Sequence, residues 1–227
     1  MLHAIAFAFA EKSLEIAATV FLVLVVVGSA LIGPHNKLPG RNDAPLPMKS
    51  LGKMPILQVE LARNEKDLER VFTPGNLERN VQDARIGNSL DTFLFIPSYA
   101  GLLISIGLIL ARGDDRWRVM LILVTLVAVP LAAVCDWTEN SGISKVLDKL
   151  AVGKPLVDTD ATRISTPSFI KWTTLGLVLL IYGVAAARRL GIWNWPLAII
   201  AVTGLGLGTI LLTTLFRYLL ERYRPQP

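Results

Sequence analysis

The stretch VFLVLVVV, residues 20–27, decides the fold, and it lies at the centre of an apolar run that covers residues 16–33. In water such a stretch would suit a buried strand. Within a membrane, only a helix or a closed barrel satisfies every backbone N–H and C=O group. A barrel needs many alternating segments of about ten residues, and the sequence has no such set. The stretch therefore predicts a membrane-spanning helix.

Similar apolar runs recur along the chain, and the composition agrees with them. Hydrophobic residues make up 52% of the 227 residues and charged residues 18%, whereas a typical soluble domain is about 25% charged. A helix needs roughly 20 apolar residues to cross a hydrocarbon core about 30 Å thick. We therefore expect an all-α integral membrane bundle of about five transmembrane helices, one in each of the runs 16–33, 92–111, 119–135, 172–187 and 196–216.

The first run has a second interpretation, as a cleaved signal peptide, because Gly28, Ser29 and Ala30 resemble a cleavage site. However, its apolar part is longer than the roughly 7–15 residues of a signal peptide, and the residues before it are weakly charged. We expect an uncleaved amino-terminal anchor helix in residues 1–33.

Residues 34–90 are too polar to enter the membrane, and we expect an extramembrane linker followed by a small helical cap. Within it, residues 56–61 could form a short strand or the start of a helix. Asn64 and Asn76 are predicted N-caps of two short helices. The apolar faces of these helices are too small for an independent core. The cap should therefore pack on the bundle, which we expect in residues 91–227 together with a short tail.

Two acidic motifs lie at the edges of the apolar runs, DTFLFI at 91–96 and CDWTEN at 135–140. A charged side chain well inside a bilayer costs roughly 2.5–3.5 kcal/mol and needs a partner. The two motifs fall at the same membrane face, on helices that a short connection makes antiparallel neighbours. Their carboxylates are therefore expected to meet. The predicted ligand-binding residues of this site are Asp91, Tyr99, Asp136, Glu139 and Asn140.

The site has three interpretations. In the first it is structural: the acids accept hydrogen bonds from Arg63, Arg85, Arg163 or Lys171 and hold the cap on the bundle. In the second it is a polar floor for a lipid-like ligand such as a lipid or isoprenoid, with aromatic walls. The third is catalytic, with the carboxylates split into an acid and a base. The walls of the second interpretation come from Tyr99, Trp137 and Trp172.

The leading functional hypothesis is a non-enzymatic membrane protein that binds a lipid-like ligand or a protein partner at the acidic interface. The alternative is a membrane-embedded enzyme that acts on a lipid or isoprenoid through Asp91, Asp136 and Glu139. No P-loop, Gly-x-Ser-x-Gly, His-Glu-x-x-His, Cys-x-x-Cys or dinucleotide-binding motif occurs in the sequence, so the common soluble chemistries are unmarked.

We expect no cofactor and no metal. The two histidines, His3 and His35, are far in sequence from the acidic motifs, and an oxygen-only site for Ca²⁺ or Mg²⁺ has no support beyond the acids themselves. The single cysteine, Cys135, excludes an intrachain disulfide. The net charge of +5 comes from scattered basic residues without interleaved aromatics, which argues against nucleic-acid binding.

Membrane lipids are the expected partners. Gly204 and Gly208 form a GxxxG pair in the last run, which suits ordinary helix packing or a homodimer. The short connections at 112–118 and 188–190 are rich in arginine. By the positive-inside rule, they place the amino terminus in the cytoplasm of a bacterial inner membrane that the chain crosses several times. The arginines of the tail 217–227 argue against this orientation.

Three features together resemble a set of bacterial polytopic membrane proteins without an established activity. These are Glu60-Leu61-Ala62 before a small helix, Asp91 with Phe95 and Tyr99 at the start of a span, and Asp136-x-x-Glu139-Asn140 at the end of the next. The resemblance covers roughly residues 56–140. It implies a helical membrane architecture and draws attention to these positions, but it implies no activity.

Overall fold

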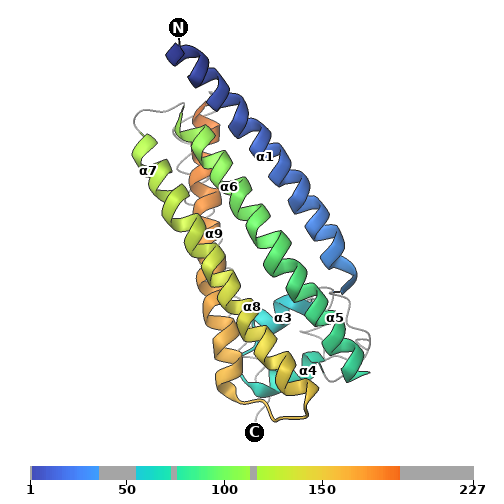
Figure 1. Cartoon of the computed structure of the whole chain (residues 1–227). Helices are drawn as coiled ribbons and strands as arrows, with labels where there is room; N and C mark the ends of the chain where they lie inside the picture. Colours follow the sequence, from blue (N-terminus) through green and yellow to red (C-terminus); the bar gives the residue numbers. More distant parts are fainter. Residues whose placement is uncertain (1, 36–54, 73–75, 113–116, 190–227) are drawn as a thin grey trace. The chain divides into compact units, whose positions relative to one another are not determined.

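The computed structural model describes residues 2–35, 55–72, 76–112 and 117–189, and within them every regular element is a helix (Figure 1). The chain divides into two units, Met1–Val178 and Leu179–Pro227. The description that follows concerns the first unit, which holds both acidic motifs.

The helices follow one another along the chain with short connections. The long amino-terminal helix comes first, the small helices of the cap follow, and two long helices each contain one π-helical turn. The elements are α1 (Leu2–His35), α3 (Pro55–Glu60), α4 (Glu65–Phe72), α5 (Leu77–Leu90), η2 (Asp91–Phe95), α6 (Ile96–Ala111), α7 (Arg118–Leu123), η3 (Val124–Ala128), α8 (Val129–Ala151) and α9 (Asp158–Arg189).

Four stretches of these helices are long and apolar enough to cross a membrane: Lys12–His35, Leu77–Ala111, Arg118–Ala151 and Asp158–Arg189. The prediction of an all-α membrane protein is therefore confirmed, and four described spans are close to the five expected. The fifth predicted run, 196–216, lies outside the described residues. The same holds for Gly204 and Gly208, so the GxxxG pair stays a prediction.

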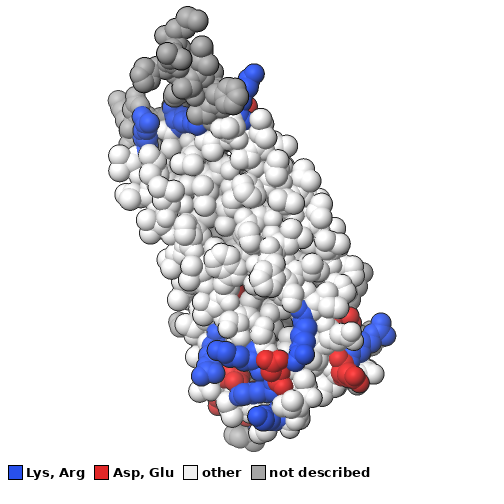
Figure 2. Space-filling view, viewed as in Figure 1, with Lys and Arg blue, Asp and Glu red and all other residues white. Residues whose placement is uncertain are grey.

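Apolar side chains of the spans face outward. Val26 and Val127 are each 60% exposed, which is unfavourable in water and favourable in lipid. On the face seen in Figure 2, uncharged side chains cover a broad band of the described helices, and charged side chains gather at the end that carries α3 and α4. This distribution fits a membrane-embedded band with an extramembrane end.

The second and third spans are longer than a membrane requires. At about 1.5 Å per residue, the 35 residues of Leu77–Ala111 extend roughly 50 Å, compared with a hydrocarbon core of about 30 Å. The expectation that residues 137–170 form a loop is wrong, because α8 continues to Ala151 and α9 begins at Asp158. A stripe of apolar residues at spacings of three and four keeps this part of α8 helical and packs it on the cap.

The cap forms as predicted around its two N-cap residues. The side-chain oxygen of Asn64 accepts a hydrogen bond from the backbone N–H of Asp67 at 3.0 Å, and that of Asn76 accepts one from Arg79 at 3.1 Å. Each bond satisfies a donor that the first turn of a helix leaves open. The segment whose type the sequence left open is the helix α3, which begins at Pro55, a residue well suited to the first helical position.

The apolar faces of the cap are buried against α8 and the start of α9. Phe72 and Leu68 of α4 are almost completely buried there, beside Val146 and Leu147 of α8 and Ile164 of α9. This confirms that the cap packs on the bundle. It also explains why the cap needs no core of its own. The core cluster consists of Val59, Ala62, Leu68, Val71, Phe72, Val81, Ile143, Val146, Leu147, Leu150, Leu156, Ala161 and Ile164.

Two π-helical turns, η2 and η3, directly precede the prolines of the second and third spans. The backbone N–H of Ile96, before Pro97, bonds to the carbonyl five residues back, and the N–H of Val129, before Pro130, does the same. A proline ring clashes with the carbonyl four residues before it. We infer that the wider turn relieves this clash and keeps both spans helical where the sequence predicted kinks.

Helix α1 packs along α6 at a glycine (Figure 1). A Cβ atom built on Gly101 would lie 2.5 Å from the ring of Phe21, so only glycine leaves room for this ring. At the far end of α8, Gly153 has a φ of +66° and ends the helix in a left-handed turn before α9.

Candidate functional site

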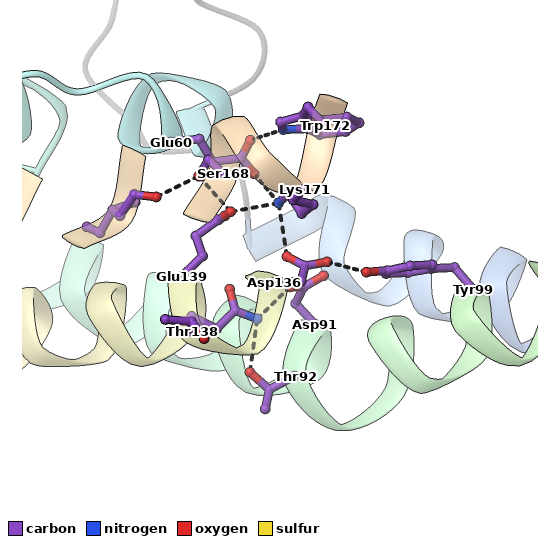
Figure 3. A network of polar contacts seen from close by, with 12 residues as sticks. Glu60, Asp91, Thr92, Tyr99, Asp136, Thr138, Glu139, Ser168, Lys171 and Trp172 are labelled. Atoms are coloured by element: carbon purple, nitrogen blue, oxygen red, sulfur yellow. Dashed lines mark hydrogen bonds and ion pairs between the residues drawn. The ribbon is translucent and has the colours of Figure 1, made fainter. Parts of the chain in front are cut away.

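Lys171 of α9 lies at the centre of the acidic site. Its ammonium group is 2.9 Å from Oδ1 of Asp136, 2.8 Å from Oε2 of Glu139 and 3.3 Å from Oε1 of Glu60 (Figure 3). A lysine ammonium has three N–H donors. All three therefore have a carboxylate oxygen within reach, and one cation is shared by three acids.

Glu60 brings the cap into this network. It is the last residue of α3, and its second oxygen, Oε2, accepts a hydrogen bond from the indole N–H of Trp172 at 2.7 Å. Both partners of Glu60, Lys171 and Trp172, are neighbours on α9. The side chain of Glu60 therefore fastens the cap to this helix through two polar contacts.

Tyr99 of α6 approaches Asp136 from the other side. Its hydroxyl donates a hydrogen bond of 2.9 Å to Oδ2 of Asp136, so each oxygen of this carboxylate has a partner. The ring of Tyr99 packs against that of Phe95, with centroids 5.6 Å apart. The predicted stripe of Asp91, Phe95 and Tyr99 on one helix face thus holds the phenol in place.

Glu139 is fixed by a neighbour on α9 as well. The hydroxyl of Ser168, one turn before Lys171, donates to Oε2 of Glu139 at 2.6 Å. Glu139 is only 1% exposed. Gly142, one turn further along α8, faces Ile164 and the backbone of Arg163, and this allows the two helices to approach closely.

Asp91 lies beside this group and has a different partner. The side-chain N–H of Asn140 donates to Oδ2 of Asp91 at 2.6 Å and to the hydroxyl of Thr92 at 3.0 Å. The side chain of Asn88 in turn donates to the backbone carbonyl of Asn140 and to Ser144. The end of α5 and the middle of α8 are therefore joined by neutral hydrogen bonds at the edge of the charged group.

The π turn η2 explains a further contact. The N–H of Ile96 bonds to the carbonyl of Asp91 instead of that of Thr92, and Pro97 has no N–H to offer. The carbonyl of Thr92 accepts the indole N–H of Trp137 at 3.0 Å. A buried or lipid-facing carbonyl needs such a donor. Trp137 therefore satisfies the backbone group that the turn leaves open, and it ties η2 to α8.

The network is withdrawn from solvent. Asp136 and Lys171 are each 4% exposed and Glu60 is 5% exposed. Removing charges from water costs several kcal/mol per ion, and good geometry is needed to offset this cost. Because the four elements α3, α6, α8 and α9 all contribute, the network contacts every part of the fold around it.

The five residues predicted from the sequence, Asp91, Tyr99, Asp136, Glu139 and Asn140, all lie in this one network. Their role in binding a ligand stays a prediction. Of the four basic residues considered as partners, Lys171 pairs with the acids, whereas Arg85 pairs with Asp148 on the outside at 2.7 Å. Glu60 and Ser168 were not predicted as site residues. The signal for Glu60 was an acid that follows apolar residues in the cap, and Ser168 carried no signal.

The arrangement leaves little freedom for chemistry on a substrate. The carboxylate oxygens named above face donors of the protein itself, and a lysine occupies the position between three of them. Two surface cavities in the described part of the chain are lined by other residues, of α1 and of α6 and α7. Among the described residues, no group of three or more His, Cys, Asp or Glu side chains is placed to hold a metal ion.

Comparison of the chain with protein-family models, with curated proteins and with solved structures finds no match.

Proposed function

We propose that this chain is a non-enzymatic, multi-pass membrane protein whose acidic network takes up protons, and that these protons hold the cap on the membrane helices. The observation that carries the proposal is the sharing of the single ammonium of Lys171 by three buried carboxylates. The function would be a response to pH: the cap is held firmly when the network is protonated and is loosened when it is not.

Charge counting gives the physical reason. Four carboxylates, those of Glu60, Asp91, Asp136 and Glu139, face one ammonium in the network. If all were ionised, four negative charges minus one positive charge would leave an excess of three. Such an excess is very unfavourable in a buried place, and acids in this situation share protons instead.

The remaining polar neighbours do not supply a compensating cation. Tyr99 of α6, Ser168 and Trp172 of α9, and Asn140 of α8 are neutral hydrogen-bond donors. The buried thiol of Cys135, next to Asp136 in the sequence, is a further titratable group on α8. Bound protons are therefore the simplest means to reduce the excess charge.

The network connects protonation to the position of the cap, because Glu60 is the last residue of α3. A second contact between the cap and α9 also joins two acids. The backbone N–H of Glu65 donates to Oδ1 of Asp158 at 3.3 Å, and a hydrogen bond between the two side chains raises the pKa of the Glu65 carboxyl above its ordinary value. Both contacts would thus be strengthened by protons.

The sign of the effect follows from linkage. An acid that holds its proton more strongly when the cap is attached stabilises the attached state at low pH, and this contribution is lost as the pH rises. We therefore expect the cap to be most firmly attached under acidic conditions and to open more often at alkaline pH. Each proton released would change the opening equilibrium by up to about tenfold per pH unit.

The contacts favour this function over the two hypotheses drawn from the sequence. A lipid-like ligand or the substrate of an enzyme needs polar atoms that point into an open space. Here Lys171 and Tyr99 occupy the oxygens of Asp136. A proton needs no cavity, and it can bind to an oxygen that already takes part in a hydrogen bond.

Hydrogen exchange of the purified protein in lipid nanodiscs tests the proposal. Backbone amides of residues 55–72 are followed by mass spectrometry over a range of pH, and the rates are corrected for the intrinsic pH dependence of exchange. We expect the protection of these amides to fall as the pH rises. In Asp91→Asn, which permanently removes one negative charge from the network, protection should be higher at alkaline pH and the pH dependence weaker.

The matched control is Glu78→Gln, which removes an exposed acid of α5 outside the network. Its exchange profile should follow that of the unmodified protein. The proposal fails if protection of the cap is independent of pH, or if Asp91→Asn and Glu78→Gln change the profile to the same extent.

A further inference from the structure

A second candidate site lies at the other end of the first unit, where α1, α6 and α7 meet. A cavity of about 190 Å³ opens there between the three helices. Its walls combine two arginines with apolar side chains: Leu14, Leu108, Ala111, Arg112, Arg118 and Ile122. None of these residues belongs to the acidic network.

We propose that this cavity binds the phosphate group of an anionic glycerophospholipid. The guanidinium groups of Arg112 and Arg118 would hold the phosphate oxygens, and the apolar walls would contact the glycerol and the first carbons of the acyl chains. The protein would thus select anionic over zwitterionic lipids at this end of the bundle.

The positions of the two arginines match the depth of lipid headgroups. Arg112 directly follows the end of α6 at Ala111, and Arg118 is the first residue of α7. Both therefore lie at the ends of candidate spans, where the hydrocarbon core gives way to the polar region. Arginine also presents a planar fork of donors that suits phosphate oxygens, often in bidentate geometry.

The size and lining of the cavity favour a lipid over a small soluble ligand. Sites that enclose a whole small molecule usually measure about 300–1,000 Å³, so this cavity has room only for a headgroup. The apolar surface beside it is open to the membrane: Val119 is 69% exposed and Leu123 is 57% exposed. Acyl chains can lie along this surface while the phosphate is held inside.

A neighbouring surface adds to the positive charge of this end. A second cavity, of about 430 Å³, lies on α1 and is lined in part by Lys12 and by the exposed Ile16 and Val20. Basic pockets between membrane helices are typical sites for anionic headgroups, and each basic residue near such a surface contributes about 1 kcal/mol. The cavity with Arg112 and Arg118 is the part of this surface that can enclose a phosphate.

Lipid selection by the purified protein tests the inference. The protein is reconstituted in nanodiscs that contain equal amounts of phosphatidylglycerol and phosphatidylcholine, then extracted in mild detergent, and the retained lipids are identified by mass spectrometry. We expect phosphatidylglycerol to be enriched. Arg118→Met should reduce this enrichment about fivefold, and so should Arg112→Met. The matched control is Arg85→Met, an arginine at the cap end that is paired with Asp148.

Two further arms make the test decisive. Leu108→Trp fills the cavity without changing a charge, and it should reduce the enrichment as well. It also serves in place of Arg112→Met if that variant does not fold. Equal enrichment in Arg118→Met and in the unmodified protein would overturn the inference. It would also be overturned if millimolar inorganic phosphate displaced the lipid, because the site would then belong to free phosphate.

Discussion

The two ends of the first unit use charge in opposite ways. At the cap end, Lys171 is buried and contacts three carboxylates of the same chain. At the other end, Arg118 is exposed and lines a cavity. Charges that are withdrawn from water must find partners within the fold, whereas charges at an open surface remain available to partners outside it.

This difference teaches where the protein should be sensitive to substitution. At the cap end, the loss of one partner leaves others buried and uncompensated, so stability should change. At the cavity end, the loss of a charge leaves nothing buried, so lipid binding should change and stability should not. The predictions below test this separation.

The largest effect is expected from Lys171→Met, which removes the shared cation and leaves three buried carboxylates without it. Breaking a buried ion pair on one side typically costs about 3–5 kcal/mol. The free energy of unfolding in mild detergent, measured by chemical denaturation, should fall by this amount. Lys145→Met, which changes an exposed lysine of the same end, is the control, and an equal loss in both variants would contradict the central role of Lys171.

Asp136 and Asp91 make a matched pair, because both are acids of the network but only Asp136 contacts the lysine. Asp136→Asn removes the charge that faces Lys171 and weakens the bond from Tyr99, and hydrogen bonds to charged groups contribute about 1.5–3 kcal/mol. Asp91→Asn keeps an oxygen for Asn140 and removes an excess negative charge. We expect its effect to be within about 0.5 kcal/mol or stabilising. Unfolding curves recorded at the same pH distinguish the two, and a larger loss in Asp91→Asn would refute the charge count.

A smaller loss is expected from Tyr99→Phe. The ring stays packed on Phe95, but the hydroxyl that donates to Asp136 is removed. Because Lys171 still partners the other oxygen of Asp136, the cost should lie at the low end of the range for such bonds, about 1.5 kcal/mol. Differential scanning calorimetry in detergent would detect it. An unchanged transition temperature would mean that the phenol does not stabilise the acid.

The sequence was sufficient to place the acidic residues together, and the reason is physical. A carboxylate at the edge of an apolar run is costly, so Asp91 and Asp136 were conspicuous, and the order of the spans put them at one membrane face. The N-caps of the cap helices were equally legible, because Asn64 and Asn76 each precede an acidic first turn.

Other parts were not legible, because they depend on contacts between distant segments. The helix beyond Trp137 was expected to be a loop, since its apolar stripe has meaning only when the cap covers it. The role of Glu60 depends on its approach to Lys171, which lies 111 residues later in the chain. The π turns before Pro97 and Pro130 could not be distinguished from kinks, because both respond to the same steric conflict.

The smallest effect on stability is expected from Arg118→Met, and this prediction completes the comparison between the two ends. The side chain is exposed, and its removal leaves no charge buried, so the free energy of unfolding should change by less than about 0.5 kcal/mol. The same variant should lose much of its preference for anionic lipid. If unfolding were measured in detergent with added phosphatidylglycerol, the unmodified protein would gain stability by mass action and Arg118→Met would gain less. A large loss of stability without lipid would instead show that Arg118 serves the fold, and the separation between a cap end that holds the protein together and a cavity end that binds lipid would no longer stand.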